Sequence, residues 1–464
     1  MKLALLIANR GFFPSSVIES ARADMRAATE QCGIGLIEPD PSLTRYGAVE
    51  TADEGARYAA FLNENRGLFD GVIVCLPNFG DENGIKAAIR GANVPMLLQA
   101  YPDEIGRMGF ANRRDAFCGK LGLSAVLKQM DYRYTSGLPF AMHPLSEAFH
   151  RELSDFIAIC RIVKGMRSTR LGCFGARTTA FKSVRFDEIA LERHGVEVET
   201  FDLAHLFARV REIPEDAPGI EEWVGRLSQT MCLNDAPAYA HTALGKLGVA
   251  LDGYIREFSL DAFAIRCWSE LQQEFQITPC SILGVFNQAG VPAACETDVS
   301  NAVAMRALSL ASGNPSGCLD LNNNYGDDPE KLILFHCGPL PLDLMTGAGR
   351  IEEHKMFTKT QGANCSWGLN VGSIRPGEIT LVGMRTDRGE IEYYVEEAEI
   401  TSDPVEAEFF GTSGVMRLPD LQKKLQHIAE AGFRHHAIIT RGHCARAVSE
   451  ALTKYLDYRR IDLS

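Results

Sequence analysis

The chain has 464 residues, of which 46% are hydrophobic and 23% charged, and its formal net charge is −13 at pH 7. This is the composition of an ordinary globular protein, and the length favours two or three domains. An acidic surface repels phosphate backbones, and no apolar run is long enough for a signal peptide or a membrane span. We therefore expect a cytoplasmic enzyme of small molecules that binds neither nucleic acid nor a membrane.

Strand and helix signals alternate over the first third of the chain. Four short apolar runs are separated by stretches of helical periodicity: Leu3–Ala8, Gly33–Ile37, Gly71–Leu76 and Val94–Gln99. This alternation is typical of βαβ units and a parallel sheet, whose ligands gather beyond the carboxyl ends of the strands. Arg10 and Asn78 follow two of these runs and are candidate substrate contacts, although each is explained equally well as a plain polar turn.

The alternation starts again at Thr169, after a helical connector near Pro144–Val163. Later strand-like runs are Arg170–Phe174, Val196–Phe201, Asp261–Arg266 and Gly290–Ala294. Neither a GxGxxG motif nor a P-loop occurs, so dinucleotide and nucleotide binding have no support. We predict one α/β domain over residues 1–165 and a second over residues 166–327.

The pattern changes after Asp328. Strand-like runs at Lys331–Cys337, Ile379–Arg385 and Ile391–Ile400 are separated by Gly, Pro and Asp without intervening helices, which indicates antiparallel pairing. The chain then closes with helical, strand-like and helical segments. We predict a third, mostly β domain over residues 328–464.

The thirteen cysteines follow no metal-binding or disulfide spacing. Their number is odd, no C-x-x-C pair occurs, and several lie within apolar runs, such as Cys75 in VIVCLP and Cys173 in RLGCFG. We interpret them as small buried side chains in a reducing compartment.

The most informative stretch is VPAACETDVSNAVAM (residues 291–305), in which an apolar strand leads into Glu296 and a helix follows. A carboxylate at the end of a buried strand is costly unless it is paired or binds a metal. Helix caps favour Asp over Glu, so Asp298 is explained as the N-cap of the helix. Glu296 is thereby left as a candidate functional residue.

Asp320 ends another apolar segment, in GCLDLNNNY (residues 317–325), 24 positions after Glu296. Adjacent strands that deliver both carboxylates to one end of a sheet would form a site for a hard cation. An Asn-rich turn would explain the same residues without any function.

Histidines complete the candidate site. His336 ends the apolar run of LFHCGPLP, and His435 and His436 precede a strand in GFRHHAIITRG. Neighbouring side chains of a strand point to opposite faces, so only one of the pair can easily face a site. A single histidine such as His336 is more often a satisfied core residue than a ligand. Together, two carboxylates and an imidazole suit Mn²⁺, Mg²⁺ or Fe²⁺, and the thiolates of structural zinc sites are lacking.

These motifs resemble those of a known family. The order ACETDV, LDLNN, FHCGP and HHA, with the preceding run FAIRCWSELQQEFQITPCSILGVFNQAGVPAACE (residues 263–296), is similar to the L-fucose isomerase and L-arabinose isomerase superfamily. The likeness is greatest to its L-fucose isomerase-like branch. It covers the second and third predicted domains, and the first only in its α/β character. Members of this superfamily interconvert aldoses and ketoses with a divalent metal ion.

The resemblance implies an α/β fold with two Rossmann-like, doubly wound parallel-sheet domains and a mostly antiparallel, β-barrel-like C-terminal domain. Residues 1–165 would recognise the substrate of this or a neighbouring subunit. Residues 166–327 would carry Glu296 and Asp320, and residues 328–464 would carry His436. A homo-oligomer, either a hexamer or a trimer, is also implied.

By the same resemblance, Glu296 and Asp320 would bind the cation and move the proton, His436 would be the imidazole ligand, and His336 would be a further ligand. Mn²⁺ is the expected cofactor, with Mg²⁺, Co²⁺ and Fe²⁺ as alternatives. Which of His435, His436 and His443 faces the metal stays open. The candidate substrate contacts are Arg10, Asn78, Trp268, Asn322 and His435.

We therefore predict a metal-dependent aldose–ketose isomerase that acts on a free pentose, deoxyhexose or modified hexose by proton transfer through an enediol. Two alternatives stay open. The scaffold can serve another metal-dependent carbohydrate reaction, such as that of an epimerase, lyase or hydrolase. Two consecutive α/β domains also occur in non-catalytic sugar-binding proteins.

Overall fold

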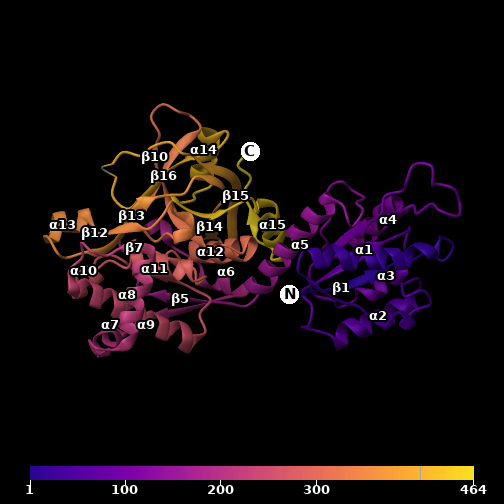
Figure 1. Cartoon of the computed structure of the whole chain (residues 1–464), viewed down its shortest axis with the longest axis horizontal. Coiled ribbons are helices and arrows are strands. Elements are labelled where there is room, and N and C mark those ends of the chain that lie inside the picture. The colour runs from indigo at the N-terminus through magenta and orange to yellow at the C-terminus, as the bar shows by residue number, and fades with distance from the viewer. Residues whose placement is uncertain (408) are drawn as a thin grey trace. The chain divides into compact units, whose positions relative to one another are not determined.

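A computed structural model describes residues 1–407 and 409–464 (Figure 1). The chain divides into two compact units, Met1–Lys164 and Gly165–Ser464. The predicted mixed α/β class is confirmed, with two parallel sheets and one large mixed sheet. The second and third predicted domains lie within one compact unit, and their boundary at residues 327 and 328 stays a prediction.

The first unit is built on a four-stranded parallel sheet with the order β2-β1-β3-β4. Its strands are β1 (Lys2–Ile7), β2 (Gly35–Ile37), β3 (Gly71–Leu76) and β4 (Met96–Ala100). All six residues of β3 are buried, as expected for a central parallel strand that is covered on both faces.

Helices cover both faces of this sheet. They are α1 (Ile18–Gln31), α2 (Ala52–Glu64), α3 (Glu82–Ala88), α4 (Ala116–Gln129) and α5 (Glu147–Met166). Alternate residues of β1 point to opposite sides: Leu6 packs in a core with α2, α3 and α4, whereas Leu5 packs in a core with α1 and α5. The sheet is therefore wound on both sides, and its carboxyl edge is left to loops.

The second unit contains another parallel sheet, in the order β6-β5-β8-β9. Its strands are β5 (Thr169–Phe174), β6 (Val196–Phe201), β8 (Ala262–Ile265) and β9 (Ala293–Ala294). The helices that belong to this region are α6 (Glu188–Arg193), α7 (Leu203–Glu212), α8 (Pro218–Thr230), α9 (Ala238–Phe258), α10 (Glu270–Phe275), α11 (Cys280–Gln288) and α12 (Val299–Ser312). Helices α7 to α11 share one hydrophobic core with the sheet.

A ten-stranded mixed sheet forms the rest of this unit, in the order β18-β15-β14-β17-β10-β11-β16-β13-β12-β7. Because β15 also pairs with β16, six of these strands close into a ring. The strands are β7 (Met231–Cys232), β10 (Ser316–Asn324), β11 (Lys331–His336), β12 (Gly349–Glu353), β13 (Trp367–Ser373), β14 (Gly377–Asp387), β15 (Glu390–Ile400), β16 (Thr412–Arg417), β17 (His436–Arg441) and β18 (Arg459–Arg460). The helices are α13 (Lys355–Gln361), α14 (Leu421–Glu430) and α15 (Ala445–Ser449), and α15 continues into a π-helical turn, η5 (Glu450–Tyr455).

The mixed sheet corrects one prediction. Asp320 was expected beside Glu296 on the second parallel sheet, but it lies on β10, which pairs with β11 and β17. Local sequence pattern does not specify which sheet a strand joins, because strand pairing depends on contacts with distant segments.

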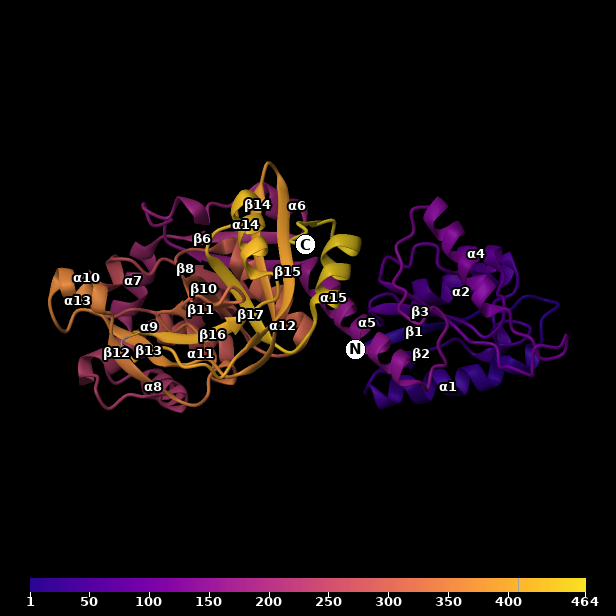
Figure 2. The ribbon, with the colours of Figure 1, turned by 90° about the horizontal axis from the view of Figure 1, so that it is seen from above.

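Helix α12 lies between the two sheets of the second unit (Figure 1), which Figure 2 shows from above. It contacts β5, β8 and β9 of the parallel sheet and also β10, β14 and β17 of the mixed sheet. Ten of its fourteen residues are buried, and small side chains such as Ala302 and Ala304 allow the close approach. The N-terminus of α12 therefore lies where both sheets can contribute side chains.

Two further expectations can be compared with the structure. No helix of the described residues is long and apolar enough to cross a bilayer. All thirteen cysteines lie in the described part of the chain, where none of them forms a disulfide bond. A cytoplasmic location stays a prediction.

Candidate active site

Glu296 lies in a tight turn between β9 and α12. Its φ is +61° and that of Thr297 is +57°, a left-handed conformation that costs a non-glycine residue about 1 kcal/mol or more. Backbone hydrogen bonds hold the turn, from Thr297 N to Ile265 O (3.1 Å) and from Asp298 N to Cys295 O (3.0 Å). The turn directs Glu296 inwards, and the residue is only 6% exposed.

Asp298 caps α12, as the sequence predicted, by accepting a hydrogen bond from Asn301 N (3.1 Å). The same carboxylate also accepts two hydrogen bonds from the Arg434 guanidinium and a third from Nδ1 of His436 (2.7 Å). Burial raises the pKa of Asp298, but the charge of Arg434 and the hydrogen bond from His436 outweigh burial and hold it well below its usual range. Asp298 is therefore a buried, ionised carboxylate that supports the site.

His436 and Asp320 are brought together by strand pairing. They are direct partners in the antiparallel pair β10–β17, so their side chains emerge on the same face. Nε2 of His436 lies 2.8 Å from Oε2 of Glu296 and 3.5 Å from Oδ1 of Asp320. Burial lowers the pKa of His436, but its hydrogen bonds to Asp298 and Glu296 and their charges raise it to about 10.

His336 ends β11, the neighbouring strand, and its ring centroid lies 6.0 Å from that of His436. One of its ring nitrogens is within 4.8 Å of ligand atoms of Glu296 and His436. Its Nδ1 accepts a hydrogen bond from the backbone N of Cys337 (2.8 Å). Burial lowers the pKa of His336, but the Cys337 side chain and the charges of Asp320 and Glu296 raise it to about 9.

The polar atoms of these side chains fit a divalent cation. Within the described residues, Asp320 Oδ1 and His336 Nε2 are buried and have no hydrogen bond, while Glu296 Oε2 and His436 Nε2 form an ion pair of 2.8 Å. Burying polar and charged atoms is costly unless a partner or a metal compensates them, and here several lie close together. Two buried thiols, Cys267 and Cys295, also lie within 4.8 Å of a carboxylate oxygen of Glu296. The groups that contain His436 offer only carboxylate oxygen and imidazole nitrogen, which suit Mn²⁺ or Mg²⁺.

Two other predicted residues flank this centre. His435 has a side chain that is 45% exposed, and its Nε2 lies 3.9 Å from Oδ1 of Asp320. Asn322 is exposed and donates to the side chain of Asn323. The alternation expected for the histidine pair is observed, since His436 is buried and His435 is not.

Trp268 follows β8 and is half-buried. Its ring makes edge contacts with Phe181 (5.3 Å between centroids) and Phe357 (5.6 Å). These contacts are those of packing, and sugar stacking by Trp268 stays a prediction.

The remaining predicted residues lie in the first unit. Asn78 is fully buried, and its Nδ2 donates to Asn9 Oδ1 (2.6 Å) and to Pro14 O (3.3 Å). Arg10 stacks over the ring of Phe79 at 4.1 Å. The amide of Asn78 thus supports the loops at the carboxyl edge of the sheet, and substrate binding by either residue stays a prediction.

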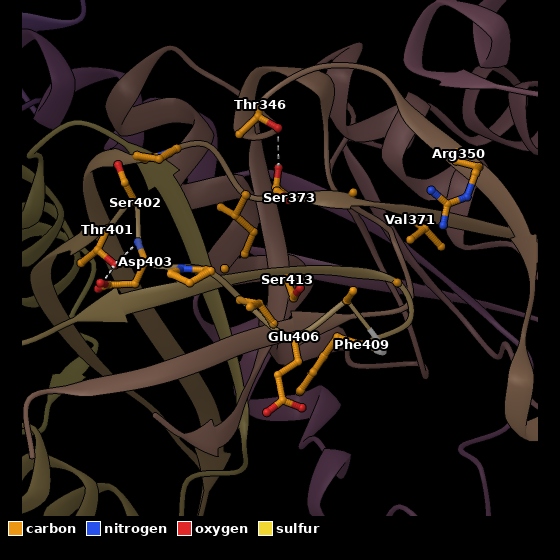
Figure 3. A pocket seen from close by; sticks show the side chains of 18 residues that line it. Thr346, Arg350, Val371, Ser373, Thr401, Ser402, Asp403, Glu406, Phe409 and Ser413 are labelled. Carbon is orange, nitrogen blue, oxygen red and sulfur yellow. Dashed lines mark hydrogen bonds between the residues drawn. The ribbon is translucent and has the colours of Figure 1, made fainter. Parts of the chain in front are cut away.

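A separate cavity of about 530 Å³ lies between β12, β13, β16 and the segment 401–407 (Figure 3). Thr401 and Asp403 line one side, where the Thr401 hydroxyl donates to Asp403 Oδ2 (2.7 Å), and Arg350 and Val371 line the other. No histidine is among its described lining residues, and neither Glu296 nor Asp320 is. This cavity is therefore distinct from the carboxylate–imidazole centre.

The sequence did not reveal Arg434 or the second role of Asp298. Two signals were available: Arg434 stands two residues before His436, and Asp298 stands two residues after Glu296. However, the Asp298–Arg434 contact joins residues 136 positions apart, and an N-cap alone explained Asp298.

The chain is similar to known proteins over most of its length. The model "Fucose/sulfoquinovose isomerase, N-terminal domain" matches residues 4–167, and the model "L-fucose isomerase, C-terminal domain" matches residues 334–463. A sulfoquinovose isomerase from Alkalicoccus urumqiensis is 24% identical over 399 residues, which cover 84% of this chain and 86% of that protein. Another from Priestia aryabhattai is 24% identical over 395 residues, which cover 82% of this chain and 83% of that protein.

Among solved structures, a periplasmic solute-binding protein from Actinobacillus succinogenes 130z with bound D-allose is 10% identical. The match covers 68% of this chain and 92% of that chain, with a TM-score of 0.17. At that TM-score the likeness carries no argument about fold or function.

Proposed function

The chain belongs to the L-fucose isomerase-like superfamily, and from this premise we propose that it is a metal-dependent aldose–ketose isomerase. The observation that carries the proposal is that His436 Nε2 lies between two carboxylates, 2.8 Å from Oε2 of Glu296 and 3.5 Å from Oδ1 of Asp320. This combination suits carbohydrate isomerisation, in which a proton must leave a carbon beside a carbonyl while charge builds up on oxygen.

Glu296, Asp320 and His436 would hold the divalent cation, with Mn²⁺ as the first candidate. Bound there, the ion would polarise the carbonyl and hydroxyl oxygens of the sugar and offset the negative charge of the enediolate. Imidazole and carboxylate are the ligands expected for such an ion.

The two carboxylates would divide the proton transfers. Burial raises the pKa of Glu296, but the hydrogen bond and charge of His436 outweigh burial and lower it, so the group is ionised and can accept a proton. One carboxylate would take the proton from C2 of the aldose and return it to C1, and the other would pass the hydroxyl proton from O2 to O1. Glu296 is shielded from water, whereas the Asp320 side chain is 20% exposed.

The substrate we propose is a free sugar, with a sulfonated hexose to be tested first because the curated relatives are sulfoquinovose isomerases. Pentoses and deoxyhexoses belong in the same panel. We also propose a homo-oligomer, supported by apolar side chains that the first unit exposes: Ile105 is 97% exposed and Phe110 is 84% exposed. Light scattering after gel filtration tests the oligomer, and a monomer at micromolar concentration would contradict it.

The decisive experiment is turnover by protein that has been stripped with EDTA and reloaded with Mn²⁺. Each aldose is incubated in D₂O, and ketose formation and deuterium at the exchanging carbon are followed by NMR. Isomerisation predicts both signals, a hydrolase or lyase predicts new fragments, and a sugar-binding protein predicts neither. Asp320→Asn should abolish turnover while the circular dichroism spectrum is retained, and full activity of this variant would refute the proposal.

A further inference from the structure

The two buried histidines of the centre use their Nδ1 atoms in opposite ways. Nδ1 of His436 lies 2.7 Å from Oδ2 of Asp298. Because Asp298 is ionised and paired with Arg434, its oxygens can only accept hydrogen bonds. Nδ1 of His436 must therefore carry a proton, and in the neutral ring Nε2 is left with its lone pair.

His336 has the reverse arrangement. Its Nδ1 lies 2.8 Å from the backbone nitrogen of Cys337, which can only donate. Nδ1 of His336 is therefore the acceptor, and in the neutral ring the proton sits on Nε2. That Nε2 is buried and has no hydrogen bond partner among the described residues.

A nitrogen that carries a proton has no lone pair to give to a cation. The family resemblance already implies that His436 is the imidazole ligand of the metal; we propose that His336 is not a ligand but a catalytic residue whose Nε2–H donates to an oxygen of the sugar. This inference rests on the proposed isomerase function. It also revises the expectation that both histidines bind the metal.

The hydrogen bond from the backbone nitrogen of Cys337 supports the neutral ring that this division requires, because a protonated Nδ1 could not accept it. A neutral imidazole N–H can then stabilise the oxygen that becomes negative in the enediolate.

Asp298 and Arg434 act as positioning residues in this arrangement. Asp298 has no unused oxygen for the centre, since its carboxylate accepts hydrogen bonds from Arg434, His436 and Asn301. Together, Asp298 and Arg434 determine which ring nitrogen of His436 carries no proton, as carboxylates commonly do for metal-bound histidines.

The test compares His336→Gln with His436→Gln, using Mn²⁺ alone as the probe. Binding is measured by calorimetry, and directly coordinated ¹⁴N is detected by pulsed EPR of bound Mn²⁺. His336→Gln should keep Mn²⁺ affinity within about threefold and keep the ¹⁴N signal, while His436→Gln should lose the signal and about 100-fold in affinity. Loss of the ¹⁴N signal in His336→Gln, or failure of the unaltered protein to bind Mn²⁺, overturns the assignment.

A second measurement does not depend on the variants folding. In protein labelled with ¹⁵N-histidine and loaded with Mg²⁺, the proton should be on Nδ1 of His436 and on Nε2 of His336. The opposite tautomer at His336 refutes the proposal. Failure of the proposed isomerase function would be recognised separately: the unaltered protein would convert no sugar, but the two variants would still differ in Mn²⁺ binding. Where turnover is present, His336→Gln should lower kcat by about 100-fold.

Discussion

The two parallel sheets have the same connectivity, β2-β1-β3-β4 and β6-β5-β8-β9, yet their carboxyl ends differ in chemistry. At the end of β3, the buried amide of Asn78 is satisfied by Asn9 and by the backbone. After β9, the buried carboxylate of Glu296 forms an ion pair of 2.8 Å with His436. Both edges are polar and buried, but Glu296 supplies a carboxylate to the proposed cation site, whereas Asn78 supplies a neutral amide. We propose that the charge and pairing of such groups, rather than the fold itself, mark the reactive edge.

The sharpest test of this difference is Glu296→Gln. The amide keeps the size of the side chain but removes the proton acceptor and an anionic ligand, so kcat should fall by about 10³-fold. Turnover with saturating Mn²⁺ and sugar measures the effect, and circular dichroism reports whether the fold is retained. Activity within tenfold of the unaltered protein would contradict the assigned role.

Asp298→Asn should have the next largest effect, although Asp298 does not face the metal. The amide can donate to Nδ1 of His436, which would move the proton to Nε2 and block ligation, and Mn²⁺ affinity should fall by about 10- to 100-fold. The variant also leaves Arg434 buried without its counter-ion, at a cost of about 3–5 kcal/mol in unfolding free energy. Calorimetry and urea unfolding measure the two effects; unchanged Mn²⁺ affinity would show that Asp298 does not set the metal-binding nitrogen of His436.

The reactive edge should also make stability depend on pH. The pKa of His436 is raised from 6.5 to about 10 in the folded protein. Its contribution to stability is therefore fully present below pH 6.5 and is lost as the pH rises towards 10. Because Mn²⁺ competes with this proton, the rise in melting temperature that Mn²⁺ produces should increase over the same range.

Scanning fluorimetry with EDTA or Mn²⁺ from pH 6.5 to 10 checks that prediction. His436→Gln is the matched control, since it should flatten both curves. A Mn²⁺ effect that shrinks as the pH rises would mean that the cation does not displace the proton of His436.

The smallest change is expected at the unreactive edge. Asn78→Ala leaves Asn9 without one partner, so unfolding free energy should fall by about 1–3 kcal/mol. Mn²⁺ affinity should stay the same, because this amide belongs to the first unit and is already satisfied. A loss of Mn²⁺ affinity comparable with that of Asp298→Asn would erase the distinction between the two edges.

Much of the α/β pattern was predictable because it depends on local periodicity. The run Gly71–Leu76 was predicted with the bounds that β3 has, and the run at Leu3–Ala8 differs from β1 by one residue at each end. The run at Gly290–Ala294 contains a strand of only two residues, since the chain leaves β9 early to form the left-handed turn at Glu296. Such turns depend on surrounding hydrogen bonds rather than on the residues themselves.

By itself, the sequence determined which polar side chains lie at positions expected to be buried. Glu296, Asp320 and His336 each end an apolar run, where a charge or an imidazole is costly without a partner. Only the tertiary structure decided that Asp320 comes from the mixed sheet and stands opposite His436. It also decided that Arg434 and Asp298 meet and that the two imidazoles are held in opposite senses. The physical reason is that the free-energy cost of burying a polar group depends on that residue and its immediate neighbours in the chain. Strand pairing and the direction of hydrogen bonds depend on distant segments that only packing brings together.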